Sequence, residues 1–255
     1  MLIDTHVHLN TNKFKDNYKE VVQRAIENDV KIMIVVGFDK DTNKKAIKLA
    51  EEYPFIYATV GYHPTDANII KDVDYVLLRE QLKHEKVIGI GECGLDFYWD
   101  KEHTEKQIKE FKTHIELSLE LDLPLIIHMR DASEATYKVL SEYKNIKGIM
   151  HCYSGSPEMV PMFLNLGLHI SLGGPVTFKN GHKPKEVAKI VPEDRLLIET
   201  DSPYLTPHPF RGKTNEPMRV KLVAEEIARL REVSFGEISE ITTNNALKLF
   251  AIKEF

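Results

Sequence analysis

Six residues of the types that bind divalent cations lie at separate places along the sequence. His6 and His8 stand one residue apart in the opening segment MLIDTHVHLN. The others end or directly follow short apolar runs, and they are Glu92, His128, His151 and Asp201. An ionisable side chain at the end of a buried apolar run is costly unless it is paired or bound to a metal. Each residue alone also fits a hydrogen-bonded core histidine or a helix cap, but the set indicates a metal site.

The donor set is larger than one catalytic zinc ion needs. Such an ion takes three protein ligands and a water, whereas this set holds four histidines and two carboxylates. It suits two adjacent divalent ions, with Glu92 as the carboxylate that bridges them. Paired ions about 4 Å apart clamp the oxygens of a displacement and generate hydroxide at neutral pH, so the expected reaction is hydrolysis. Imidazole and carboxylate ligands leave Mg²⁺, Mn²⁺, Zn²⁺ and Ni²⁺ all open.

The elements that carry these residues are eight short runs rich in Val, Ile and Leu. The runs cover residues 2–8, 31–37, 55–61, 86–92, 123–128, 146–151, 167–173 and 195–200. Stretches of helical periodicity separate them. Over residues 105–122 the apolar positions form one helical stripe, which consists of Ile108, Phe111, Ile115 and Leu119. Two further helices are expected over roughly 217–231 and 235–251.

Eight buried strands that alternate with helices predict an all-parallel sheet. An open doubly wound sheet and a closed (β/α)₈ TIM barrel both fit this order, and the count of eight favours the barrel. We find no low-complexity segment, charge block or Ser/Gly linker, so a single α/β domain over residues 1–255 is expected. In a TIM barrel the active site lies at the C-terminal ends of the strands. The candidate metal ligands stand at those ends.

Composition narrows the class of function. The formal net charge is −5 at pH 7, whereas a protein that coats duplex phosphate carries a basic surface. A small site that takes one strand end stays compatible with this charge. Two cysteines cannot form a disulfide framework, which favours a reducing compartment. No signal-like start and no apolar run of about 18 residues occurs. We therefore expect a soluble, cytoplasmic protein without membrane contact, and no obligate protein partner is evident.

Seven motifs, in order from residue 4 to residue 250, resemble the TatD family of metal-dependent deoxyribonucleases, within the amidohydrolase-like TIM barrels. They are DTHVHL, GYHP, GIGECGLDFYWD, LPLIIHMRDA, HCYSGS, LLIETDSPYLTP and TTNNALKLF. GECGLDF together with ETDSPYL is highly specific, whereas the H-x-H start is shared by many hydrolases. The resemblance implies a (β/α)₈ barrel and a two-metal phosphodiesterase that removes nucleotides from DNA 3′ ends, single-stranded or frayed.

The resemblance also implies how the donors divide between two metal ions. One metal would be held by His6, His8, Glu92 and Asp201, and the other by Glu92, His128 and His151. Every ligand position of the family pattern carries the expected residue type in this chain. The resemblance therefore implies an active enzyme.

Catalytic roles are expected for four residues, Glu92, Asp201, His63 and Arg130. Asp201 either takes the proton of the attacking water while it binds a metal or serves as a ligand alone. The Arg130 guanidinium could fork onto a phosphate, or form a surface ion pair with a neighbouring acidic residue. His63 either contacts the substrate phosphate or is a turn residue held by the proline that follows it.

A further group of residues is expected to support the ligands or the substrate. Asp96, Glu199 and Ser154 are candidates because a ligating histidine usually donates its other N–H to a nearby acceptor. Asp96 lies in a loop expected to fold over the site, where positioning of the substrate is also possible. The aromatic run at residues 97–99 could stack on a base, as in single-strand binders, or pack in the core.

Two other classes of function stay open. An amidohydrolase or phosphoesterase that acts on a small molecule would use the same donors, because C–N, C–O and P–O hydrolysis all use two-metal centres. Related amidohydrolases commonly carry a carboxylated lysine on the fourth strand, and Glu92 at that position favours the nuclease. A non-catalytic metal-binding or scaffolding protein is the third class, and the complete donor set argues against it.

Overall fold

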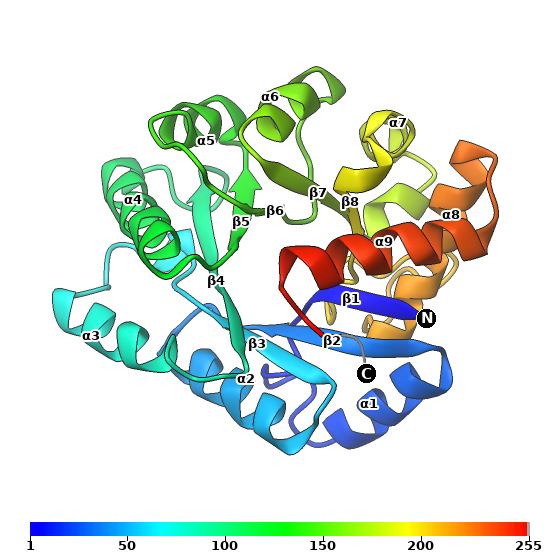
Figure 1. Ribbon diagram of the computed structural model, residues 1–255, viewed down its shortest axis with the longest axis horizontal. Helices are drawn as coiled ribbons and strands as arrows, with labels where there is room; N and C mark the ends of the chain where they lie inside the picture. Colours follow the sequence, from blue (N-terminus) through cyan, green and yellow to red (C-terminus); the bar gives the residue numbers. More distant parts are fainter. Residues whose placement is uncertain (254–255) are drawn as a thin grey trace.

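The computed structural model describes residues 1–253, and its eight strands form one parallel sheet (Figure 1). The strands are β1 (Leu2–Val7), β2 (Val30–Val36), β3 (Ile56–Val60), β4 (Val87–Asp96), β5 (Leu125–Arg130), β6 (Gly148–Met150), β7 (Leu168–Leu172) and β8 (Leu196–Ile198). They pair in chain order from β1 to β8. An isolated parallel bridge between Val7 and Ser202 brings the two edges together. The expected TIM barrel, as a single domain, is confirmed.

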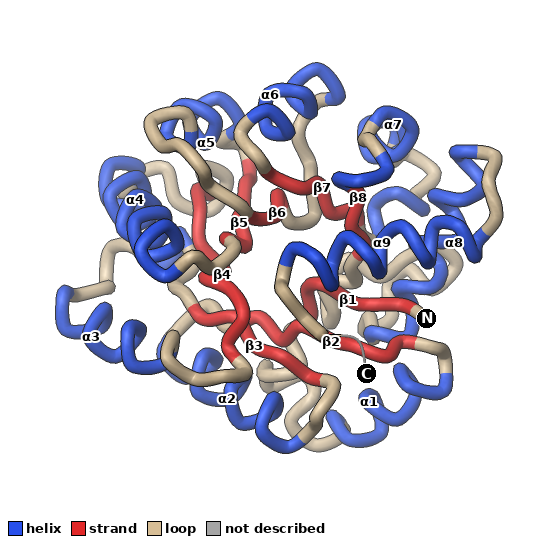
Figure 2. Tube along the Cα trace, viewed as in Figure 1, coloured by secondary structure: helices blue, strands red, loops and turns tan. Residues whose placement is uncertain are grey.

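Helices surround this ring of strands (Figure 2). They are α1 (Tyr18–Glu27), α2 (Lys40–Glu52), α3 (Asp72–Gln81), α4 (Thr104–Leu121), α5 (Ser133–Leu140), α6 (Val160–Asn165), α7 (His182–Ile190), α8 (Val220–Arg231) and α9 (Phe235–Leu249). The α8 helix begins later than expected, because Pro217–Arg219 forms a separate 3₁₀ turn. Among these helices of residues 1–253, none combines the length and the apolar character that crossing a membrane would require.

The stripe expected on α4 is partly wrong. Phe111 and Ile115 are fully buried, but Leu119 is exposed. The buried face instead includes His114 and Ser118, which lie three residues beyond Phe111 and Ile115 respectively. The face is rotated because both polar side chains hydrogen-bond to backbone groups, so that they can be buried without loss of partners.

The fourth strand is longer than expected. A strand over 86–92 would end at Glu92, whereas β4 continues to Asp96 and pairs with β5 from Cys93 to Asp96. Gly94 makes this extension possible. Its φ is +137°, and a Cβ there would lie 2.1 Å from the His128 carbonyl oxygen, so only glycine lets the two strands approach. Asp96 is therefore the last residue of a strand and not part of a loop over the site.

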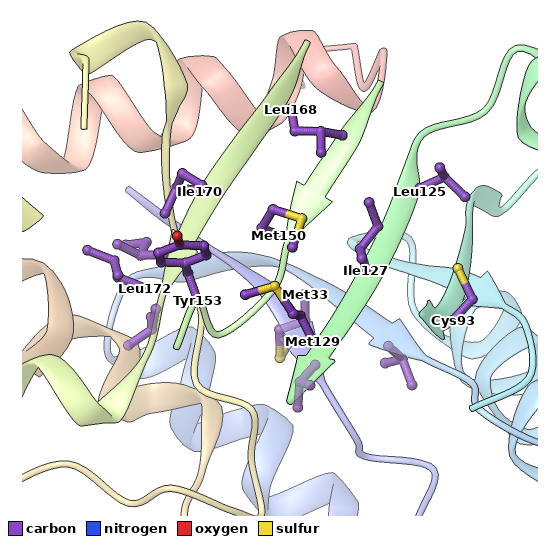
Figure 3. Packing of buried hydrophobic residues seen from close by; sticks show 14 of the residues in the cluster. Met33, Cys93, Leu125, Ile127, Met129, Met150, Tyr153, Leu168, Ile170 and Leu172 are labelled. Carbon is purple, nitrogen blue, oxygen red and sulfur yellow. The ribbon is translucent and has the colours of Figure 1, made fainter. Parts of the chain in front are cut away.

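Buried apolar side chains form two clusters. The larger one lies between the strands and the helices, and Figure 3 shows Met33, Cys93, Leu125, Ile127 and other members of it. The smaller one fills the inside of the barrel near the N-terminal ends of the strands. It is closed by the last turn of α9 and the residues after it, and it consists of Ile3, Ile32, Ile34, Val36, Ile126, Ile149, Leu197, Ala246, Leu247, Phe250 and Ile252.

Candidate metal centre

Three of the polar side chains point into the barrel because side chains alternate regularly along their strands. Ile126, Ile149 and Leu197 belong to the cluster inside the barrel. Side chains two residues apart on a strand share a face. The residues that continue the same face towards the C-terminal ends are His128, His151 and Glu199, and Asp201 follows two residues further.

On β1, the polar side chains point into the barrel because of a local irregularity in the strand. Ile3 packs inside the barrel, so strict alternation would turn His6 and His8 outward. The register between β1 and β2 shifts between Asp4 and Val7, where β1 has one residue more than its partner. An extra residue of this kind reverses the alternation. Both imidazoles thereby point to the inside.

The fourth strand contains a second irregularity of the same kind. Gly89 faces the inside, because a Cβ there would lie 3.5 Å from Phe250 of the inner cluster. Glu92 comes three residues later and would face outward under strict alternation. The register with β5 shifts between Ile90 and Cys93. The shift brings the Glu92 carboxylate into the centre of the barrel mouth.

A first group of donors lies around one oxygen of Glu92. The Nε2 atoms of His6 and His8 are 3.0 Å apart. Each lies 3.6 Å from Oε2 of Glu92, and they lie 3.7 and 3.4 Å from Oδ1 of Asp201. A tetrahedral ion with bonds near 2.1 Å holds its donors about 3.4 Å apart. The four side chains therefore already have the spacing of a coordination shell.

A second group lies around the other oxygen of the same carboxylate. Oε1 of Glu92 is 2.9 Å from Nδ1 of His128 and 3.1 Å from Nε2 of His151. Those two nitrogens are 3.4 Å apart. The Nε2 atom of His63 lies 3.7 Å from the same oxygen. The two oxygens of Glu92 thus face two different sets of imidazoles. Two groups that share this carboxylate have ligand atoms close enough to hold a metal ion, namely His6, His8 and Glu92, and His63, Glu92 and His128.

Hydrogen bonds fix the orientation of three of these rings. Nδ1 of His8 lies 3.0 Å from the Val36 carbonyl oxygen, which accepts its proton. Nδ1 of His151 lies 3.1 Å from Glu199, and Nε2 of His128 lies 3.0 Å from Asp96. In each ring the outer nitrogen is thereby engaged, and the nitrogen that faces the centre is the one that can bind a metal ion once it gives up its proton. Asp96 and Glu199 thus each contact the outer nitrogen of one of these histidines.

The centre is strongly charged although it is buried. Burial raises the pKa of Glu92, but the neighbouring His151 and His128 outweigh it and hold that pKa well below its usual range. Burial likewise lowers the pKa of His151, and the charges of Glu92 and Glu199 raise it well above the usual value. Asp201 is held ionised by His8 and His6 against the effect of burial. Buried carboxylates that stay ionised favour a bound cation.

The other candidate residues lie at the rim or further away. Nδ1 of His63 accepts from the Thr65 N–H at 3.3 Å, so this residue both caps the turn after β3 and reaches the centre. Arg130 is exposed, and in residues 1–253 it forms no ion pair, contrary to the alternative of a surface salt bridge. The Ser154 hydroxyl donates to the Met129 carbonyl oxygen and not to a histidine.

Sequence reasoning missed Asp4. This carboxylate is fully buried and accepts hydrogen bonds from the backbone N–H and the hydroxyl of Thr200 at 2.9 and 2.5 Å, and from the His6 N–H at 3.3 Å. Burial raises the pKa of Asp4 to about 8. The contacts tie the ligand segment of β1 to the segment that carries Asp201. An acidic residue inside the apolar run before His6 was the available signal.

Known proteins similar in sequence to this chain belong to one family of hydrolases. A family model described as TatD related DNase matches residues 3–251. YabD of Bacillus subtilis (strain 168), a metal-dependent hydrolase, is 50% identical over 99% of this chain and 100% of its own length. YcfH of Escherichia coli (strain K12), also a metal-dependent hydrolase, is 38% identical over 98% and 96% of the two chains.

Solved structures indicate the same family and the same fold. The crystal structure of YJJV, a TatD homolog from Escherichia coli K12, superposes with a TM-score of 0.93 at 30% identity and covers 99% of this chain and 98% of that one. An organophosphorus hydrolase from Deinococcus radiodurans shares the fold alone, with a TM-score of 0.66 at 11% identity over 98% and 92% of the two chains. The chain therefore belongs to the TatD family and is a metal-dependent hydrolase.

Proposed function

We propose that this protein is a two-metal 3′-to-5′ exodeoxyribonuclease that cleaves the terminal phosphodiester bonds of single-stranded or frayed DNA. The observation that supports it best is the position of Glu92, because its two oxygens face two separate donor sets. A carboxylate placed in this way suits two cations held side by side, the arrangement used for in-line displacement at phosphorus. The direction of cleavage and the choice of DNA follow from the family resemblance.

The family resemblance implies how the donors would divide between two ions, and the distances between the side chains support that division. His6, His8, Glu92 and Asp201 would hold one divalent ion, and Glu92, His128 and His151 the other. When bound, such ions supply Lewis acidity that stabilises charge on phosphoryl oxygens and lowers the pKa of water. Mg²⁺, Mn²⁺, Zn²⁺ and Ni²⁺ are the candidates.

The protein's own side chains would then handle protons and the phosphate. Asp201 is ionised at neutral pH, so its carboxylate can accept the proton of the attacking water. Burial lowers the pKa of His63 to about 3, which keeps this ring neutral. Because its Nδ1 accepts from the Thr65 N–H, its Nε2 carries the proton and can donate to a phosphoryl oxygen.

The negative net charge is compatible with an enzyme that takes one strand end. The net charge is −5, so a long duplex would not be held by broad electrostatic attraction. Arg130 ends β5 two residues after His128, at the mouth of the barrel. Its planar guanidinium can bind one phosphate through two hydrogen bonds.

A nuclease assay tests this proposal. Metal-stripped protein would be supplied with Mg²⁺, Mn²⁺, Zn²⁺ or Ni²⁺ and incubated with single-stranded oligonucleotides labelled at the 3′ or the 5′ end. The expected result is metal-dependent shortening from the 3′ end that Glu92→Ala abolishes. Glu240→Ala, an exposed position on α9 at the other end of the barrel, is the matched control and should retain full activity.

Either of two outcomes would contradict the proposal. Intact DNA with every metal, together with hydrolysis of a nitrophenyl phosphate or an ester, would show a small-molecule hydrolase at the same centre. Shortening that starts from the 5′ end would contradict the direction of cleavage while it leaves the nuclease assignment standing.

A further inference from the structure

Two large aromatic side chains are exposed beside the metal centre. The sequence leaves open whether the aromatic run at residues 97–99 stacks on a base or packs in the core. The structure divides the run: Phe97 packs against the core, whereas Tyr98 is 52% and Trp99 68% exposed. Their rings are 4.9 Å apart and nearly perpendicular. Packing of the fold accounts for Phe97 alone.

An arginine lies over these two rings. Cζ of Arg130 is 4.0 Å from the centre of the Tyr98 ring and 5.5 Å from that of the Trp99 ring, both within the range of a cation–π contact. No acidic side chain in residues 1–253 neutralises this guanidinium through an ion pair. The contact therefore holds a positive charge and two ring faces together at one place on the surface.

The segment that carries the rings is firmly attached to the centre. One oxygen of Asp96 accepts the backbone N–H groups of Tyr98 and Trp99 at 3.0 and 2.8 Å. Its other oxygen lies 3.0 Å from Nε2 of His128. Gln107 of α4 adds hydrogen bonds to both backbone groups of Asp96. A single carboxylate thus positions the aromatic segment and a candidate metal ligand relative to each other.

Arg130 and the two aromatic rings lie close to the candidate metal centre. Arg130 and His128 are two residues apart on β5, so their side chains share a face and their Cα atoms are separated by about 7 Å along the strand. A nucleotide next to the phosphate held at the centre would lie within reach of this arginine. The rings beneath the arginine would lie level with the base of that nucleotide.

We propose that Tyr98, Trp99 and Arg130 form a stacking platform that binds a base and a phosphate of the DNA strand next to the cleaved bond. This inference rests on the proposed function and adds the feature of the substrate that the protein recognises. An unpaired base offers a π face to the exposed rings, whereas a base inside a duplex is already stacked on its neighbours. The platform therefore selects single-stranded or frayed ends without a preference for one base.

The first test uses the fluorescence of Trp99, which is the single tryptophan of the chain. Metal-loaded protein would be titrated with a short single-stranded DNA whose phosphorothioate linkages slow hydrolysis. A second strand of equal length, built of abasic tetrahydrofuran residues, carries the same backbone without bases. We expect saturable quenching of Trp99 by the first strand and little change with the second, while anisotropy of labelled strands reports binding independently.

The outcomes of this titration separate the two proposals. If the DNA binds by anisotropy and the Trp99 emission does not change, the platform is wrong and the nuclease proposal is unaffected. If neither strand binds, the proposed function fails and this inference fails with it. Equal quenching by the abasic strand would also overturn the platform, because no base would then be involved.

Kinetic measurements give a second test with matched variants. Trp99→Ala should raise the KM for single-stranded DNA by about five- to 150-fold, as expected when a base loses one aromatic partner, with kcat little changed. Trp99→Phe keeps a ring and should restore most of the affinity. For the abasic strand, wild type and Trp99→Ala should have equal KM values. A loss of kcat on both substrates would overturn the inference, because it would show that Trp99 acts only through the structure of the centre.

Discussion

The two halves of the barrel interior have opposite chemistry although the same strands build both. Near the N-terminal ends, the space is filled by Ile, Leu and Val side chains and is closed by Phe250 and Ile252. Near the C-terminal ends, the same faces of β5, β6 and β8 continue with His128, His151 and Glu199. The change from apolar to ionisable occurs within two residues on each of these strands.

This contrast shows how the fold separates stability from chemistry. Burial of apolar surface contributes roughly 25 cal/mol per Å², and the side chains of the inner cluster are buried. The ionised groups at the other end lose hydration on burial and recover it only through mutual contacts or a bound cation. Changes at the apolar end should therefore affect folding, and changes at the polar end should affect activity.

The largest effect on activity is expected from a change at the centre itself. Glu92→Ala should reduce kcat/KM by about 10⁴-fold or more, a loss typical of removing a residue on which the whole catalytic unit depends. The free energy of unfolding of the metal-free protein should fall modestly, because His128 and His151 lose their ionised partner but can become neutral in response. Activity assays and urea denaturation of the same preparation would check this. A large loss of stability would show that Glu92 also holds the barrel together.

A substitution at the apolar end of the barrel should reduce stability and leave activity unchanged. Phe250→Ala removes a nearly fully buried ring from the inner cluster. We expect a loss of about 3–5 kcal/mol in the free energy of unfolding. The folded fraction should keep a kcat close to that of the wild type. Urea denaturation and activity at low temperature would measure both. If kcat fell as far as in Glu92→Ala, the two halves would not be independent.

The sequence predicted one half of this arrangement better than the other. His128 and His151 follow buried runs in regular alternation, so their direction could be inferred from their spacing. The direction of His6 and Glu92 depends on register shifts in β1 and β4. A bulge arises from how two distant segments pair, and neither segment alone shows it. The residue types still marked both as ligand candidates.

The extension of β4 was the larger error. The apolar run ends at Glu92, and Gly94 just beyond it is of a residue type common where a chain changes direction. In the structure Gly94 instead permits close contact with His128. The wrong end of the strand placed Asp96 in a loop. It also hid the contact between Arg130 and Tyr98, which depends on how Asp96 holds the following residues.

A smaller effect is expected from a residue that supports the centre from outside. Asp96→Asn keeps the shape of the side chain but removes the charge that faces Nε2 of His128. Loss of such a supporting carboxylate typically weakens metal binding 10- to 100-fold. Calorimetric titration of the metal-stripped protein should show one weakened site and one unchanged. Equal weakening of both would mean that the donor sets act as a single site.

The smallest effect is expected on the pH dependence of stability, from a buried histidine that lies outside the centre. His114 lies outside the barrel, where its Nε2 accepts from the Tyr62 N–H and its Nδ1 donates to the Glu110 carbonyl oxygen. Burial lowers its pKa to about 4, whereas the carboxylates of the centre raise that of His151. Because a histidine in the unfolded chain titrates near 6.5, protonation favours unfolding, and the contribution of His114 is complete above that pH and is lost as the pH falls towards 4.

The lost stability should be about 2 kcal/mol between pH 7.5 and pH 5. Urea denaturation at the two pH values would measure it, with His114→Gln as the matched variant because glutamine can make both hydrogen bonds without a titrating group. The variant should lose less stability than the wild type over this range by that amount. An equal loss in both proteins would assign the acid sensitivity to other groups.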